Sequence, residues 1–232
     1  MAHNPRPRPC SNSESAPIAL AAIQYGLFLV PTLAYSIQRG FDLRGVFRLR
    51  GCKLGEAGTA ALAGFSVWAL VTAAETLRAL SVGGGSGAAS EAGRLLEASG
   101  AGSGSESLLL LALAPAVAEE LCCRGYLLTS LRSQLGRIDA IALSSLLFAL
   151  LHLAPEQIFR FTALGFACGL FAVGGTGSII PAVVVHAAHN ASALTVGPLL
   201  DLSSPLATAV ALGAAGASSG LAAYLVYLLL VG

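Results

Sequence analysis

The chain has 232 residues, of which 55% are hydrophobic and 11% are charged, with a formal net charge of +1 and a mean hydropathy of +0.76. Soluble globular domains carry about 25% charged residues, and nucleic-acid-binding proteins show a clustered basic excess, so this composition argues against both classes. It is typical of a polytopic membrane protein. Because lipid cannot satisfy an open sheet edge, we predict an all-α fold, a bundle of transmembrane helices.

Apolar runs close to the roughly 20 residues that cross the hydrocarbon layer predict about seven transmembrane helices, between six and eight. The fourth and fifth runs are short, and we expect them to be tilted or not to span fully. In chain order, the predicted helices cover residues 18–37, 54–80, 108–131, 138–153, 158–173, 179–200 and 205–231.

Composition divides the chain into four parts. Residues 1–17, rich in Pro, Ser and Arg, are expected to be a disordered tail or part of a targeting segment. Residues 18–80 hold two front helices joined by a basic loop. Residues 81–107, dominated by Gly, Ser and Ala, are predicted to be a flexible linker, and a helix bundle follows over residues 108–232.

Basic residues are unevenly distributed between the predicted loops. The first loop and the loop after the third helix lie on one side of a seven-helix layout, which the positive-inside rule makes cytoplasmic, or stromal in a plastid. The basic residues of these loops are Arg39, Arg44, Arg48, Arg50, Lys53, Arg132 and Arg137. Those predicted on the opposite side, which weaken this orientation, are Arg6, Arg8, Arg78, Arg94 and Arg160.

Polar residues interrupt the apolar runs in three places, at residues 118–124, 148–152 and 186–190. A charged side chain at mid-bilayer costs roughly 3 kcal/mol even on a lenient insertion scale, so such groups usually face one another or a watery cavity. Most of the histidines of the chain fall in these segments. We interpret the three motifs as one candidate site inside the membrane.

The first motif places two glutamates and an arginine in one predicted helix. Neighbouring helix residues point about 100° apart and residues four apart share a face, so Glu120 is predicted to pair with Arg124 while Glu119 points elsewhere. Glu119, desolvated beside small residues, is the predicted general base. A purely structural role, in which an ion pair holds two helices together, would account for Glu120 and Arg124 but not for Glu119.

The second and third motifs repeat the four-residue spacing. Phe148 shares a face with His152, so the ring can wall a pocket that the imidazole enters, although a lone membrane histidine can also be an interhelical hydrogen-bond donor. His186 shares a face with Asn190, and both can donate to one oxygen, as an oxyanion hole requires. His189 lies near the same face, and its spacing does not separate a role in the site from packing.

In this order and on successive predicted helices, the patterns EExxxR, FxxxH and HxxxN resemble the CPBP family of intramembrane proteases, which includes the type II CAAX prenyl endopeptidases. The similarity covers roughly residues 108–200 and includes the stretch between the second and third motifs, so it is more specific than any single motif. The two front helices resemble nothing that we can name.

The resemblance implies a glutamate-dependent peptidase, a hydrolase that cleaves a membrane-associated and, in some members, prenylated protein. Glu119 would activate water with help from His152, and His186 with Asn190 would stabilise the oxyanion of the scissile amide. The supporting residues would be Glu120, Arg124, Phe148 and His189.

We expect no metal in this mechanism. Glu119, His152 and His186 can offer Zn²⁺ three ligands and an open position. However, the chain has no HExxH motif, and zinc would occupy the groups that act as acid and base in the metal-free mechanism.

Two other functions remain open. A membrane scaffold or chaperone of the same fold would use the polar cavity or the front helices to hold a membrane partner, and a transporter would relay protons through the buried groups. The transporter is the weaker alternative, because the sequence shows no broken-helix pairs and no repeat between its halves. The Ala, Gly and Leu bias and similarity to plastid members of the family favour a bacterial plasma membrane or a plastid membrane.

Overall fold

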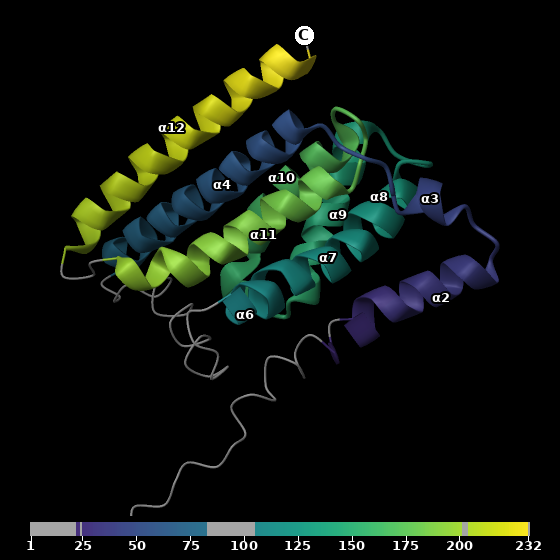
Figure 1. Ribbon diagram of the computed structural model, residues 1–232. Coiled ribbons are helices and arrows are strands. Elements are labelled where there is room, and N and C mark those ends of the chain that lie inside the picture. The colour runs from purple at the N-terminus through teal and green to yellow at the C-terminus, as the bar shows by residue number, and fades with distance from the viewer. Residues whose placement is uncertain (1–21, 24, 83–104, 201–203, 232) are drawn as a thin grey trace, which may run out of the picture.

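A computed structural model describes residues 22–23, 25–82, 105–200 and 204–231, with only the backbone described for residues 225–231. Within these residues every regular element is a helix and no strand is present (Figure 1). The predicted all-α fold is therefore confirmed.

The front of the chain forms η1 (Tyr25–Leu29), α2 (Val30–Gln38), α3 (Leu43–Val46) and α4 (Leu54–Ser81). A run of short elements carries the first motif: α6 (Ser105–Ser107), η2 (Leu108–Leu113), α7 (Ala114–Glu120), η3 (Leu121–Leu127) and α8 (Leu128–Leu131). The rest comprises α9 (Arg137–Leu151), η4 (Pro155–Gln157), α10 (Ile158–Val173), α11 (Ile180–Thr195), η5 (Gly197–Leu199) and α12 (Pro205–Val231).

The predicted helix boundaries agree with most of these elements. The predictions for residues 54–80 and 205–231 correspond to α4 and α12, and the two short predicted helices correspond to α9 and α10. The sixth predicted helix ends earlier than expected, at Thr195, and a 3-10 turn follows. Gly197 and Pro198 explain this end, because glycine favours helix termination and proline disfavours a helical residue before it.

Parts of the predicted organisation lie outside the described residues. These include the tail, most of the linker and the beginning of the first predicted helix. The division of the chain into four parts therefore stays a prediction.

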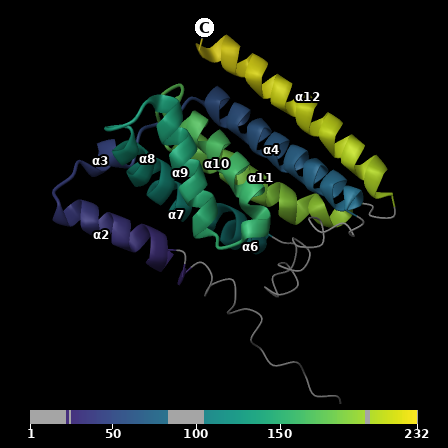
Figure 2. The ribbon, with the colours of Figure 1, turned by 180° about the vertical axis from the view of Figure 1, so that it is seen from behind.

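Three of the described helices are long and apolar enough to cross a membrane: Leu54–Ser81, Pro155–Val173 and Pro205–Tyr224. With the apolar composition, they indicate a multi-pass membrane protein. Helix α4 lies between α11 and α12 and packs extensively against both, while α2 lies at the opposite edge of the bundle (Figures 1 and 2). The motif-bearing elements α7, α9 and α11 thus lie between α12 at one edge and α2 at the other.

The predicted helix over residues 108–131 is present, but it is not a uniform α-helix. The segments η2 and η3 are π-helical and flank α7 on both sides. Pro115 lies in the first turn of α7, and because η2 runs directly into α7, its missing N–H removes one hydrogen bond of the continuous helix; the change of helix type before it thus has a local cause. Such π-helical turns are frequent at functional sites, and this pair brackets Glu119 and Glu120.

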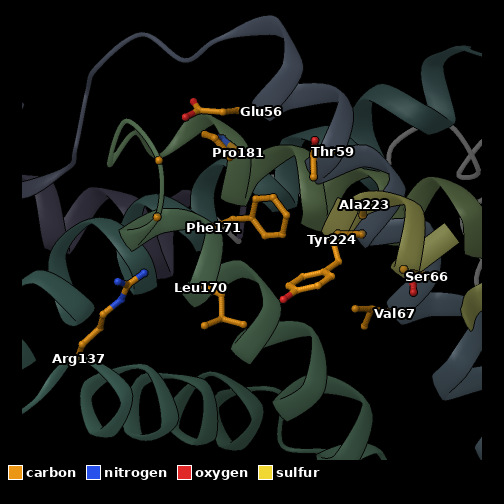
Figure 3. A pocket seen from close by; sticks show the side chains of 14 residues that line it. Glu56, Thr59, Ser66, Val67, Arg137, Leu170, Phe171, Pro181, Ala223 and Tyr224 are labelled. Carbon is orange, nitrogen blue, oxygen red and sulfur yellow. The ribbon is translucent and has the colours of Figure 1, made fainter. Parts of the chain in front are cut away.

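A cavity of about 380 Å³ opens between α4, α10 and α12. One end is formed by Glu56, Arg137 and the glycines that follow α10, and the walls are mainly apolar (Figure 3). Its described lining includes no residue of the three polar motifs, so the cavity is separate from the predicted site.

Candidate active site

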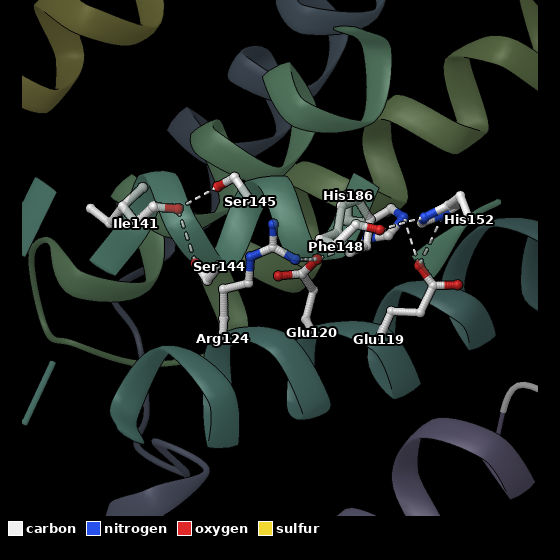
Figure 4. Close-up of polar contacts among 9 residues, drawn as sticks. All are labelled: Glu119, Glu120, Arg124, Ile141, Ser144, Ser145, Phe148, His152 and His186. Carbon is white, nitrogen blue, oxygen red and sulfur yellow. Dashed lines mark hydrogen bonds and ion pairs between the residues drawn. The ribbon is translucent and has the colours of Figure 1, made fainter. Parts of the chain in front are cut away.

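The three polar motifs meet in the interior of the bundle. Helix α7 supplies both glutamates and η3 supplies the arginine. Helix α9 brings Phe148, His152 caps the C-terminal end of α9, and α11 brings His186. Figure 4 shows these side chains pointing toward one another from their separate helices. Residues that are 66 positions apart in the chain thus come into hydrogen-bond contact.

Glu120, Arg124 and His186 form a buried network. Arg124 Nη1 donates to Glu120 Oε1 over 3.0 Å, so the predicted ion pair is present, and neither side chain is exposed to solvent. His186 Nδ1 lies 2.9 Å from the same oxygen. The guanidinium also lies over the ring of Phe148, at 4.5 Å from its centroid. This buried ion pair fixes the orientation of His186, because moving either Glu120 or Arg124 would leave the other charge buried and unpaired.

Glu119 points away from this pair, toward the two imidazoles. Its Oε2 atom lies 3.8 Å from His152 Nε2 and 3.9 Å from His186 Nε2. These separations are too long for direct hydrogen bonds, and they leave a small polar group room to contact all three side chains. The divergence of the adjacent glutamates follows the angular spacing expected from the sequence.

His152 is held from three directions. Its Nδ1 atom lies 2.8 Å from the carbonyl oxygen of Phe148. A carbonyl only accepts, so Nδ1 donates and Nε2 of the neutral ring presents its lone pair toward Glu119. The edge of Phe148 approaches His152 with centroids 4.6 Å apart, and Phe161 stacks on it at 3.7 Å and 23°.

Phe161 is a residue of the site that sequence reasoning missed. It lies near the start of α10, and it contacts both His152 and Phe148. None of the four-residue spacings includes it. Only the turn between α9 and α10 brings it onto the imidazole, so the sequence contained no local signal for this role.

Helix α11 carries the remaining predicted residues. Asn190 lies one turn after His186 and is half-buried, and its side chain makes no hydrogen bond with the described residues, so its amide can donate to a ligand. His189 is buried, and its Nδ1 atom has no hydrogen-bond partner in the described part of the chain. Unlike the imidazoles of His152 and His186, that of His189 makes no ion-pair contact with either glutamate among the described residues.

The donor set around Glu119 has the chemistry of a zinc site. His152 Nδ1 contacts a backbone carbonyl and His186 Nδ1 contacts a carboxylate, which is the usual arrangement of metal-binding histidines and leaves Nε2 as the ligand. A second set, Glu120, Cys168 and His186, has potential ligand atoms within 4.8 Å of one another. The guanidinium bonded to Glu120 opposes a cation there. The local charge therefore favours Glu119, His152 and His186 as the residues that would hold Zn²⁺.

Close packing by glycine holds α10 against this network. A Cβ atom on Gly165 would lie 2.7 Å from Arg124 Nη2 and 3.1 Å from the Cα atom of Ser145. A Cβ atom on Gly169, one turn later, would lie 2.7 Å from Ile141 Cγ2. The GxxxG spacing thus serves helix packing, as small residues in membrane helices usually do.

We expect Gly165→Ala to lower the thermal unfolding temperature in detergent by roughly 3 to 10 °C, since overpacking costs about 1 to 3 kcal/mol. The matched control is Gly58→Ala on α4, where an added Cβ meets nothing within 4 Å. That variant should gain up to about 1 kcal/mol from the better helix propensity of alanine. Equal unfolding temperatures for the two variants would contradict the packing role of Gly165.

Comparison with known proteins yields one family match. A family model described as "Type II CAAX prenyl endopeptidase Rce1-like" matches residues 105–192, the segment that runs from α6 into α11. No curated protein and no solved structure matches the chain. The matched residues contain the complete cluster of Glu119, Glu120, Arg124, His152 and His186 around which the helices are packed. Residues 105–192 therefore form a domain of the Rce1-like type II CAAX prenyl endopeptidase family, a family of peptidases.

Proposed function

We propose that the protein is a glutamate-dependent intramembrane endopeptidase that hydrolyses a peptide bond of a membrane-associated protein. The observation that carries this proposal is the position of Glu119 Oε2, at 3.8 and 3.9 Å from the Nε2 atoms of two histidines that come from two different helices. A water molecule bound among these three groups would face a base and two oriented imidazoles, as general base catalysis requires.

In the proposed mechanism, Glu119 accepts a proton from water as the water oxygen attacks the scissile carbonyl carbon. His152, held by Phe148 and Phe161, orients this water through Nε2. The carbonyl oxygen becomes an oxyanion in the tetrahedral intermediate. The proton on Glu119 then passes to the leaving nitrogen as the C–N bond breaks, so the carboxylate is regenerated.

Asn190 and His186 are the proposed oxyanion donors, and hydrogen-bond logic separates their contributions. With Nδ1 of His186 donating to Glu120 Oε1, Nε2 can donate to an oxyanion only in the doubly protonated ring. The amide of Asn190 donates in every protonation state of the site. Asn190 is therefore the more constant donor, and the pair of Glu120 and Arg124 acts by positioning His186.

The proposed substrate is a membrane-associated protein whose cleavage site reaches the interior of the bundle, and a prenylated C-terminus is one candidate because the matched family is described by that activity. We place the protein in a bacterial plasma membrane or a plastid membrane, on the basis of its composition and its likeness to plastid members. The proposed mechanism needs no metal. Zn²⁺ held by Glu119, His152 and His186 would instead act as a Lewis acid toward the scissile carbonyl.

A direct test is to incubate the purified, reconstituted protein with a farnesylated peptide ending in a CAAX sequence and with the same peptide lacking the farnesyl group. We expect mass spectrometry to detect release of the C-terminal tripeptide, and we expect the rate to survive exhaustive chelation. One tightly bound zinc per chain, with activity lost on its removal and restored on its return, would refute the metal-free mechanism. Absence of cleavage of both peptides would refute the prenylated CAAX protein as the substrate.

A further inference from the structure

The loop between α3 and α4 brings three guanidinium groups together at one end of the bundle. Its Arg48 and Arg50 lie near Arg132, which follows α8, and the two segments are in contact because Thr129 Oγ1 of α8 donates to the carbonyl oxygen of Val46 over 3.1 Å. Burial, followed by the positive charges of Arg132 and Arg50, lowers the pKa of Arg48 below its ordinary value. Like charges gathered in this way repel one another unless an anion lies between them.

Arg48 is also held in an unusual conformation. Its φ angle of 53° lies in the left-handed region, which a residue with a side chain adopts at a conformational cost. Its carbonyl oxygen accepts from Ile179 N over 3.1 Å, and its Nη1 atom donates to the carbonyl oxygen of Ala172 over 3.4 Å. Its Nε atom is buried and has no hydrogen-bond partner in the described part of the chain. The loop is thus fixed to the turn between α10 and α11 with one buried donor unused.

The carboxylates nearest in sequence do not neutralise this cluster. Asp42 accepts from the backbone N–H groups of Arg44 and Gly45 at the start of α3. Glu56 accepts from the backbone and hydroxyl of Thr176 and from the N–H of Lys53. Among the described residues, no salt bridge joins Arg48, Arg50 or Arg132 to a carboxylate. The cluster therefore carries positive charge that no described carboxylate pairs, and this charge favours an external anion.

The cavity between α4, α10 and α12 begins at the same turn. Gly174 and Gly175 form part of its rim, and the next residues of this turn contact the loop, because Ser178 Oγ donates to the carbonyl oxygen of Arg50. On α4 the lining runs from Glu56 to Val67. At 1.5 Å per residue that run spans about 16 Å, roughly half the hydrocarbon thickness of a bilayer. The cavity thus has the depth and the apolar character for a lipid chain from one leaflet.

We propose that Arg48, Arg50 and Arg132 bind the phosphate of an anionic phospholipid whose acyl chain enters the neighbouring cavity. Guanidinium groups match phosphate oxygens in geometry and charge. The lipid would join the loop after α3 to the ends of α8 and α10, and so would tie the front helices to the matched domain. This site lies outside the Glu119 cluster and does not depend on the protein being a protease.

The test measures thermal unfolding of the full chain in a neutral detergent with three added probes: dioleoyl phosphatidylglycerol, dioleoyl phosphatidylcholine and inorganic phosphate. We expect phosphatidylglycerol at saturating concentration to raise the unfolding temperature by roughly 5 °C and the other two probes to leave it nearly unchanged. An equal rise with phosphatidylcholine would overturn the role of the arginines, and an equal rise with inorganic phosphate would overturn the lipid as the ligand.

Substitutions then locate the site. The double variant Arg50→Gln and Arg132→Gln changes exposed side chains, so it should fold normally and lose most of the shift caused by phosphatidylglycerol. Arg48→Gln should lose it as well, but its partly buried position makes it the riskier variant for folding. The matched control is Arg78→Gln, an exposed residue in the last turn of α4. An undiminished shift in the double variant, or an equal loss in the control, would overturn the proposal.

Discussion

Glu119→Gln is expected to abolish peptide cleavage while leaving the unfolding temperature nearly unchanged. The amide has the shape of the carboxylate but cannot accept the proton of the attacking water. Glu120→Gln is expected to act mainly on stability. It removes the charge that compensates the fully buried Arg124, and breaking a buried pair from one side costs roughly 3 to 5 kcal/mol. Cleavage assays and thermal unfolding in detergent, run on both variants, separate these effects.

Glu106→Gln is the matched control for this pair, since it makes the same substitution at an exposed position two turns before α7 begins. It should change neither activity nor unfolding temperature. The reverse pattern, in which Glu120→Gln is folded and inactive while Glu119→Gln is unstable and active, would exchange the roles of the two glutamates and sink the assignment of Glu119 as the base.

The sequence predicted well those features that are determined within a single helix. Apolar length located the helices, and the four-residue spacing placed Glu120 beside Arg124 and turned Glu119 away. Gly165 and Gly169 are also four residues apart, and this spacing alone indicates a close helix contact without identifying the partner helix. Local geometry fixes such pairs, because residues four apart share a helix face whatever surrounds them.

The features that sequence reasoning missed depend on how the helices are placed relative to one another. Phe161 reaches His152 only because the turn at Pro155 folds α10 back beside α9. The same limit applies to the first loop. Nothing in its residue types indicates that Phe47, which is almost fully buried, packs against Gly125 of η3. Residue types alone could not distinguish an interior contact from an interfacial one.

The π-helical turns around α7 illustrate a third kind of limit. Pro115 predicts a disturbance of the helix, but it does not predict whether the chain kinks, breaks or widens. In the structure the chain widens, which keeps the helix continuous past the two glutamates. The ion pair between Glu120 and Arg124 survives this change, because a side chain as long as arginine can adjust to a small rotation of its backbone.

Asn190→Ala is expected to separate an enzyme from a scaffold. Hydrolysis needs an oxyanion donor that strengthens its hydrogen bond in the transition state, and losing one such donor typically lowers the rate by about 10² to 10³. A scaffold needs only the shape of the bundle and its outer surfaces, which include the helices α4 and α12 beyond the matched residues. The half-buried Asn190 can lose its amide without leaving a described hydrogen-bond partner unpaired, so the variant should still insert and fold.

The measurement is complementation of a strain that lacks the gene, scored both for abundance of membrane partners and for cleavage of a substrate. Asn190→Asp sharpens the comparison, because it keeps the shape of the side chain while replacing the donor with an acceptor. Thr195→Ala, an exposed position on the same helix, is the control and should behave as the unaltered protein does. If Asn190→Ala, Asn190→Asp and Glu119→Gln all restored the function in full, the protein would act through its surfaces and not through hydrolysis, however closely its polar cluster fits that of a peptidase.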